Sequence, residues 1–108
     1  FNLIQVTVRI KKTPDAENYS SYVVKLPMEV PIGKWFDRFI EDQNVRFPES
    51  PILTKDENED IGWVFYTPKW FTIPLFVRFL DPENEAYDNR IKNRQIIYIR
   101  RVKLEKGI

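Results

Sequence analysis

The sequence contains neither histidine nor cysteine, so the side chains that could do chemistry are mainly carboxylates, lysines and aromatic groups. The missing histidine removes the usual general base and the commonest transition-metal ligand. The missing cysteine removes thiolate ligands, disulfides and a thiol nucleophile. Asp37 and Glu41 stand four residues apart, but Lys34 and Arg38 lie beside them, as on a solvated, salt-bridged helix face. The sequence therefore predicts no enzyme, no catalytic residue and no cofactor.

An acidic run in the middle of the chain invites a calcium-site interpretation. Asp56, Asn58 and Asp60 have the spacing of the first three ligands of an EF-hand loop. The pattern then fails, because Ile61 stands where that loop needs glycine and Thr67 stands where it needs glutamate. A solvated surface loop accounts for the run better, and the sequence predicts no metal site.

Aromatic side chains gather shortly after this run. Trp63, Tyr66 and Trp70 are candidates for stacking on sugar rings or nucleic-acid bases. The competing interpretation places these rings in the core, where aromatic groups dominate the packing energy. Side chains alternate between the two faces of a strand, so Trp63 and Phe65 would point one way and Val64 and Tyr66 the other.

Basic residues concentrate near the C-terminus. Residues 90–108 include seven lysines and arginines and one acidic residue. Four of them form a candidate basic patch for single-stranded nucleic acid: Arg94, Arg100, Arg101 and Lys103. The whole chain has a formal net charge of only +1, so a solvated strand face that protects a sheet edge is the simpler interpretation.

Short hydrophobic stretches must position these residues, and they are expected as strands at residues 3–10, 22–26, 63–66, 70–73, 75–80 and 95–104. The first of them alternates cleanly between apolar and polar side chains. Residues 75–80 are apolar on both faces and are expected in the centre of the sheet. In the last strand the apolar phase slips at Arg100 and Arg101, and a bulge there is expected to restore one buried face.

One stretch has a different period. Its apolar residues fall at i, i+3, i+4, i+7 and i+8, the spacing of one helix face, at Ile32, Trp35, Phe36, Phe39 and Ile40. A helix is expected at residues 32–43. With 108 residues, 43% of them hydrophobic, the chain is expected to be a single domain over residues 1–108 with its own core. No apolar run approaches the roughly 20 residues that span a bilayer, so no membrane insertion is expected.

The end of the chain carries a family resemblance. Residues 96–107, Ile-Ile-Tyr-Ile-Arg-Arg-Val-Lys-Leu-Glu-Lys-Gly, resemble the last strand of carbohydrate-binding-module-like jelly rolls, which occur in glycan-active enzymes and phage tail proteins. Gly33-Lys34-Trp35 resembles the Gly-Lys-Trp that opens a middle strand in those domains. The resemblance implies a mainly β fold, an antiparallel β-sandwich or jelly roll, with a binding or virion-assembly role. It would begin a strand at Trp35, where the periodicity indicates a helix.

A second resemblance leads to a different fold. The order strand, loop, strand and amphipathic helix in residues 3–43 is similar to that of ubiquitin-like β-grasp domains, an α+β alternative. The predicted function is a non-enzymatic binding or structural module, either carbohydrate-binding or part of a viral or extracellular assembly. The alternatives are a ubiquitin-like protein-interaction adaptor and a single-stranded nucleic-acid-binding domain. A protein assembly or a glycan is the expected partner, ahead of nucleic acid, and a virion or extracellular setting is favoured over the cytoplasm.

Overall fold

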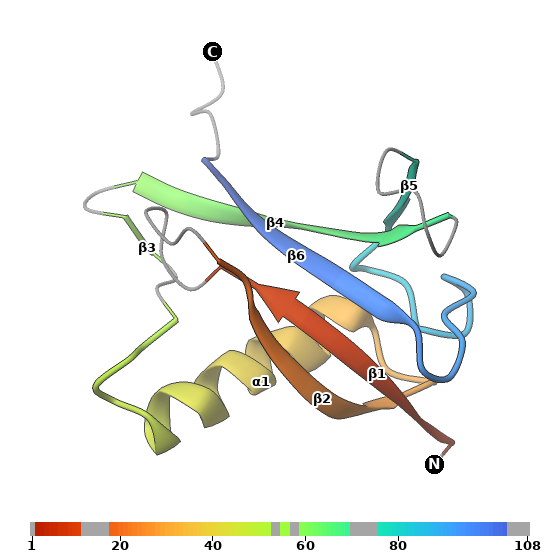
Figure 1. Cartoon of the computed structure of the whole chain (residues 1–108), viewed down its shortest axis with the longest axis horizontal. Coiled ribbons are helices and arrows are strands. Elements are labelled where there is room, and N and C mark those ends of the chain that lie inside the picture. The colour runs from red at the N-terminus through yellow and green to blue at the C-terminus, as the bar shows by residue number, and fades with distance from the viewer. Residues whose placement is uncertain (1, 12–17, 53–54, 57–58, 70–75, 104–108) are drawn as a thin grey trace.

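A mixed sheet and a single helix make up the part of the chain that the computed structural model describes, residues 2–11, 18–52, 55–56, 59–69 and 76–103 (Figure 1). The helix, α1, spans Ile32–Arg46. The strands are β1 (Leu3–Ile10), β2 (Ser20–Pro27), β3 (Lys55–Asp56), β4 (Glu59–Pro68), β5 (Val77–Leu80) and β6 (Ile96–Lys103). The structure is therefore α+β, mostly sheet with one helix, and the jelly-roll expectation is wrong.

The strands follow the order β2-β1-β6-β4-β3, with β5 paired to β4. β1 is antiparallel to β2 but parallel to β6, and β6 is antiparallel to β4. The last strand of the chain thus lies in the middle of the sheet. A connection that contains α1 separates the first hairpin from the second half of the sheet, as parallel pairing of distant strands requires.

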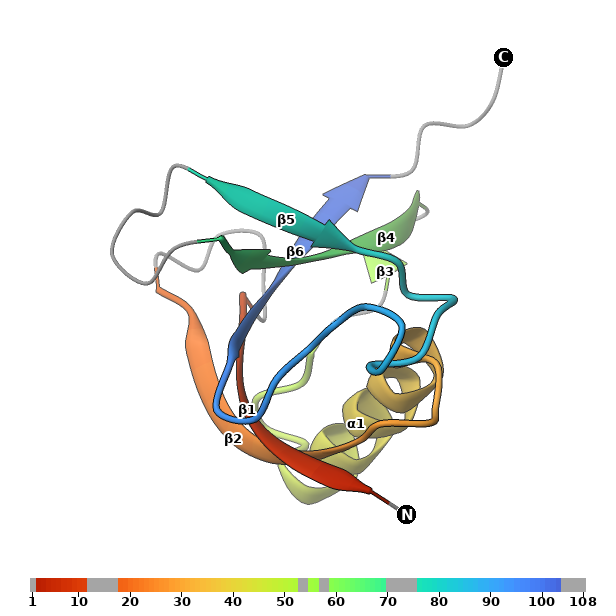
Figure 2. The same ribbon diagram turned by 90° about the vertical axis from the view of Figure 1, so that its right-hand side faces the viewer.

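Periodicity predicts the helix correctly. α1 covers residues 32–43 and continues by about one further turn to Arg46. It begins directly after Pro31, a residue whose fixed φ suits a helix start, and it ends at Arg46, with Phe47 as the C-cap residue before Pro48. Its buried side chains lie on the predicted face and pack against the sheet: Ile32, Phe36, Phe39 and Ile40. Figure 2 shows the sheet curving around this helix.

The structure differs from the sequence-based expectation at two strands. In the described residues β5 pairs with β4 alone, and Phe79 is 67% exposed, so the stretch at residues 75–80 is not central. The expected bulge is also absent, because the pairing of β4 with β6 runs without interruption from Gly62 opposite Val102 to Tyr66 opposite Tyr98. The expected strand at residues 70–73 lies outside the described residues.

The long connection between β5 and β6 is fixed by one buried side chain, Asn89. Its Nδ2 donates to the carbonyl oxygens of Asp81, Asn84 and Glu85, at 2.8, 3.2 and 3.1 Å, and its Oδ1 accepts from the Asp81 amide. The start of this connection lies against the first turn of α1, where the Gly33 amide donates to the Pro82 carbonyl at 2.8 Å. A Cβ at Gly33 would lie 3.1 Å from that oxygen, so a glycine allows this close approach.

Candidate functional site

The aromatic side chains of β4 divide between the two faces of the sheet, as strand alternation predicts. Phe65 is 3% exposed and packs edge-on against Phe36 of α1, with ring centroids 5.2 Å apart. Trp63 packs against the same ring at 5.1 Å. Tyr66 lies on the other face, stacked on Tyr98 of β6 with centroids 5.3 Å apart and planes within 10°. One set of rings therefore belongs to the core and the other faces away from the helix.

A row of four side chains crosses the outer face, one from each of β1, β6, β4 and β5. These residues, the outer row, are direct cross-strand neighbours in the order Arg9, Tyr98, Tyr66 and Phe79. Arg9 Nη1 donates to the Tyr98 hydroxyl at 2.9 Å, and its guanidinium carbon lies 5.5 Å from the Tyr98 ring centroid. Tyr66 contacts Phe79 at 6.1 Å between centroids. Cross-strand pairs of this kind hold neighbouring strands in register.

Tyr19, which precedes β2, packs over the outer row. Its ring meets Tyr98 edge-on at 5.5 Å, and its hydroxyl lies 3.3 Å from that of Tyr66. Lys11 Nζ lies 5.2 Å from the Tyr19 ring centroid. Burial, followed by the hydrogen bond with Tyr19, raises the pKa of Tyr66 to about 12. At neutral pH the Tyr66 hydroxyl is therefore protonated, and in its hydrogen bond with the Tyr19 hydroxyl either oxygen can be the donor.

The described side chains of the outer face also have a one-sided charge. Arg9, Lys25 and Arg100 carry its cations, and no carboxylate is found among the strand side chains that the structure describes on this face. Those side chains are Leu3, Gln5, Thr7, Arg9, Ser21, Val23, Lys25, Val64, Tyr66, Val77, Phe79, Ile96, Tyr98, Arg100 and Val102. By contrast, the exposed charges of α1 are three basic and three acidic: Lys34, Asp37, Arg38, Glu41, Asp42 and Arg46.

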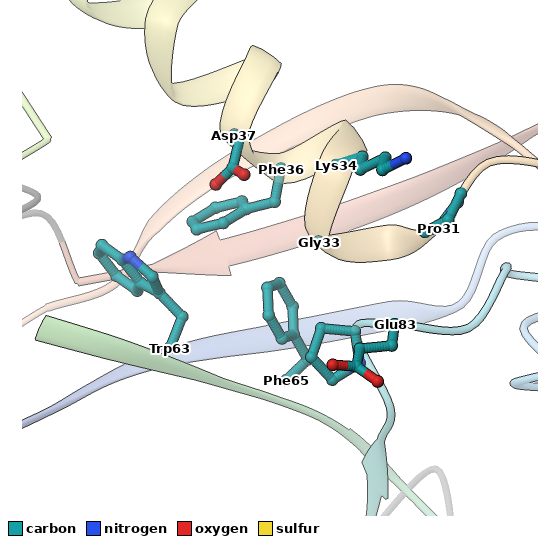
Figure 3. Close-up of a pocket in the computed structure, with 9 residues that line it drawn as sticks. Pro31, Gly33, Lys34, Phe36, Asp37, Trp63, Phe65 and Glu83 are labelled. Carbon is teal, nitrogen blue, oxygen red and sulfur yellow. The ribbon is translucent and has the colours of Figure 1, made fainter. Parts of the chain in front are cut away.

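A cleft of about 510 Å³ opens on the helix side of the sheet, between the first turns of α1, β4 and residues 82–83. In Figure 3 Phe36, Trp63 and Phe65 point toward one another across it, whereas Lys34, Asp37 and Glu83 stand around it. Its aromatic walls are the contacts that join α1 to the sheet. The cleft is therefore continuous with the core, and its rim carries charges of both signs.

The chain matches the protein-family model described as "Type VI secretion system, TssN" over residues 1–102. The chain belongs to the TssN family. A comparison with curated protein sequences gives no match. The family assignment corrects the first of the two resemblances: the jelly-roll likeness of residues 96–107 is wrong, and neither a glycan nor a virion is supported as a partner or setting.

Solved structures show the fold that this TssN segment adopts. The C-terminal ubiquitin-like domain of mouse tubulin-specific chaperone e is 11% identical and superposes with a TM-score of 0.54, over 97% of this chain and 92% of that one. The ubiquitin-like domain of the Mycobacterium tuberculosis type VII secretion protein EccD1 is 14% identical, with a TM-score of 0.49, over 92% and 98%. The first superposition supports the ubiquitin-like β-grasp alternative.

The structure separates the residues singled out as stacking candidates. Tyr66 lies in the outer row, whereas Trp63 lies on the helix side, and Trp70 lies outside the described residues. Sequence reasoning missed Tyr98 and Phe79, the two rings that flank Tyr66. The signal that could have found Tyr98 is its alternation out of phase with Ile97 and Ile99, but only the strand register brings it opposite Tyr66.

The four basic candidates do not form one patch. Arg100 lies on the outer face, whereas the guanidinium carbon of Arg101 lies 5.7 Å from the Trp63 ring centroid on the helix side. Arg94 lies in the turn before β6 with a φ of 69°, and Lys103 is at the other end of that strand. Nucleic-acid binding by this set stays a prediction, and the geometry gives it no common surface.

Two further expectations concern metals and membranes. Within the described residues there is no group of three or more side chains that could hold a metal ion, and the acidic run at residues 56–60 lies partly outside them. No helix in the described part of the chain has the length and apolar character needed to cross a bilayer.

Proposed function

We propose that this chain is a non-catalytic protein-interaction domain of a type VI secretion assembly, and that it docks a partner subunit on the outer face of its sheet. The family match supports a role in a type VI secretion assembly, and the outer row is the candidate docking surface. One observation carries the proposal: a continuous row of Arg9, Tyr98, Tyr66 and Phe79, joined by one hydrogen bond and two ring contacts, crosses the sheet on the face that α1 leaves uncovered.

The composition of this face supports a protein partner. Tyrosine, phenylalanine and arginine are enriched at the centres of protein interfaces, and they supply most of the large binding contributions. Phe79 is 67% exposed and Val23 is 66% exposed, at the two sides of the face. The rings between them are ordered by contacts with one another. A preordered aromatic surface loses little side-chain entropy on binding, so more of its contact energy appears as affinity.

Site-specific photo-crosslinking in secretion-competent cells tests the proposal. A photoreactive phenylalanine analogue is placed at Phe79 in the full-length protein, because an aromatic group already stands there. The matched control carries the analogue at Val45 of α1, which is 81% exposed and far from the outer row in the fold. We expect a discrete crosslink to another subunit from position 79 and none from position 45. Crosslinks from position 45 alone would place the docking surface on the helix and contradict the proposal.

A further inference from the structure

The charges of the outer-face side chains indicate which kind of partner segment this face could bind. Among the outer-face strand side chains that the structure describes, three are cations, Arg9, Lys25 and Arg100, and none is a carboxylate. Acidic side chains stand instead on α1 and on the β5–β6 connection, for example at Asp37, Glu41 and Glu83. The part of the outer face around Arg9, Lys25 and Arg100 therefore presents a positive potential.

Hydrogen-bond donors add to this potential at the centre of the face. The Arg9 guanidinium is held by the Tyr98 hydroxyl and ring. In the Tyr19–Tyr66 pair only one hydroxyl donates to the other, so the hydrogen of the second is left for a different acceptor. Arginine and protonated phenol are both donors to a carboxylate, and hydrogen bonds to an ionised acceptor are the strong ones. The centre of the face is suited to a carboxylate, and its flanks at Phe79 and Val23 are suited to apolar side chains.

We infer that the segment which docks on the outer face is an acidic stretch of a partner protein, with carboxylates at Arg9 and Arg100 and apolar side chains at Phe79 and Val23. This inference rests on the proposed docking function and adds the chemistry of the partner. Opposite charges across an interface steer association and exclude partners of the wrong sign, so the acidic character sets which subunit binds.

Single-stranded nucleic acid is the other anionic polymer that a positive aromatic face could bind, and the ring geometry disfavours it. Bases bind by stacking on free ring faces. Tyr98 already packs against Tyr66, Tyr19 and the Arg9 guanidinium, and Tyr66 packs against Tyr98 and Phe79. Little ring face of Tyr98 or Tyr66 is left for a base at the centre of the row, whereas the hydroxyl groups and cations remain suited to side-chain carboxylates.

The crosslink from position 79 tests the inference when it is combined with charge reversal. Arg100→Glu is compared with Arg38→Glu, because both arginines are exposed and only the first lies on the outer face. We expect Arg100→Glu to lower the crosslink yield about tenfold, since a like charge placed against the partner costs more than a lost contact. Arg38→Glu should leave the yield unchanged, and Arg100→Lys should keep most of it. Thermal melting of each variant shows that the fold is retained.

Sequencing the crosslinked peptide by mass spectrometry gives the second readout. The partner segment is expected to contain more aspartate and glutamate than lysine and arginine. A neutral or basic segment, or a yield that Arg100→Glu leaves unchanged, would overturn the acidic inference while the docking function stands. A crosslink to nucleic acid would overturn both. Absence of any crosslink from position 79 in the otherwise unaltered protein would instead remove the docking function itself.

Discussion

Two adjacent rows of side chains cross the same four strands and have opposite surroundings. The outer row is Arg9, Tyr98, Tyr66 and Phe79, and the inner row one residue along is Ile10, Ile99, Phe65 and Leu80. Every member of the inner row is buried beneath α1, whereas Phe79 at the end of the outer row is 67% exposed. The inner row is sufficient to explain why the sheet folds on the helix. The outer row is not needed to bury the helix, and the proposed docking function rests on that difference.

The largest expected difference between the two rows is the loss of stability when a phenylalanine of each row, Phe65 or Phe79, is replaced by alanine. Phe65→Ala removes a ring that packs on Phe36 in the core and should lower the free energy of unfolding by about 3–5 kcal/mol. Phe79→Ala removes an exposed ring and should cost about 1 kcal/mol or less. Urea unfolding of the two variants measures both values. Equal losses would show that the outer row is part of the folding core, and the case for a docking surface would fall.

The sequence predicts those features of the two rows that depend on residues close together in the chain, and it does not predict those that depend on distant residues. The burial of Phe36 follows from a helical period within nine residues, and the opposite directions of Phe65 and Tyr66 follow from alternation within one strand. Both are local and both are correct. The neighbours of Tyr66 are not local, because Tyr98 reaches it only through the antiparallel pairing of β4 with β6. No residue near Tyr66 in the sequence encodes that register.

Reliance on local sequence also explains two of the wrong expectations, the jelly roll and the bulge. The string at residues 96–107 describes a strand ending but says nothing of which strands lie beside it, and here the strand is central and parallel to β1. The apolar phase slip suggested a bulge at Arg100 and Arg101 because Val102 and Leu104 fall on the opposite face from Ile97 and Ile99. Arg101 instead lies beyond the last buried pair, over the Trp63 ring, where a guanidinium is stabilised without a change of register.

A smaller difference in stability is expected between threonine substitutions on the two faces of the sheet, at Thr67 and at Thr7. Thr67 is a buried polar residue on the helix side, and its Oγ1 donates to the Ile96 carbonyl at 2.8 Å and accepts from Gln95 Nε2 at 2.9 Å. Thr67→Val keeps the shape but leaves both partners without that hydroxyl, so it should cost about 1–3 kcal/mol. Thr7→Val on the outer face is the control and should change stability by about 0.5 kcal/mol or less. Urea unfolding distinguishes them, and equal effects would mean that the Thr67 hydrogen bonds add nothing.

The smallest expected effect is a change in pH dependence at the outer row. Burial and the Tyr19 hydroxyl raise the pKa of Tyr66 from 10.0 to about 12. The folded chain therefore keeps a proton that the unfolded chain loses, so this contribution to stability is fully present below pH 10 and is lost as the pH rises toward 12. Thermal melts of the wild type should fall through this window, and those of Tyr66→Phe should fall less steeply.

Tyrosinate absorbance gives the matching site-specific readout. The chain has five tyrosines, and the last to ionise should disappear in Tyr66→Phe. Tyr87→Phe removes a tyrosine that is 71% exposed and should leave that late step in place. If the late step survives in Tyr66→Phe instead, the Tyr19–Tyr66 hydroxyl pair is not held together in solution. The outer row would then be a set of separate exposed side chains, without the preordered donors that the docking of an acidic segment requires.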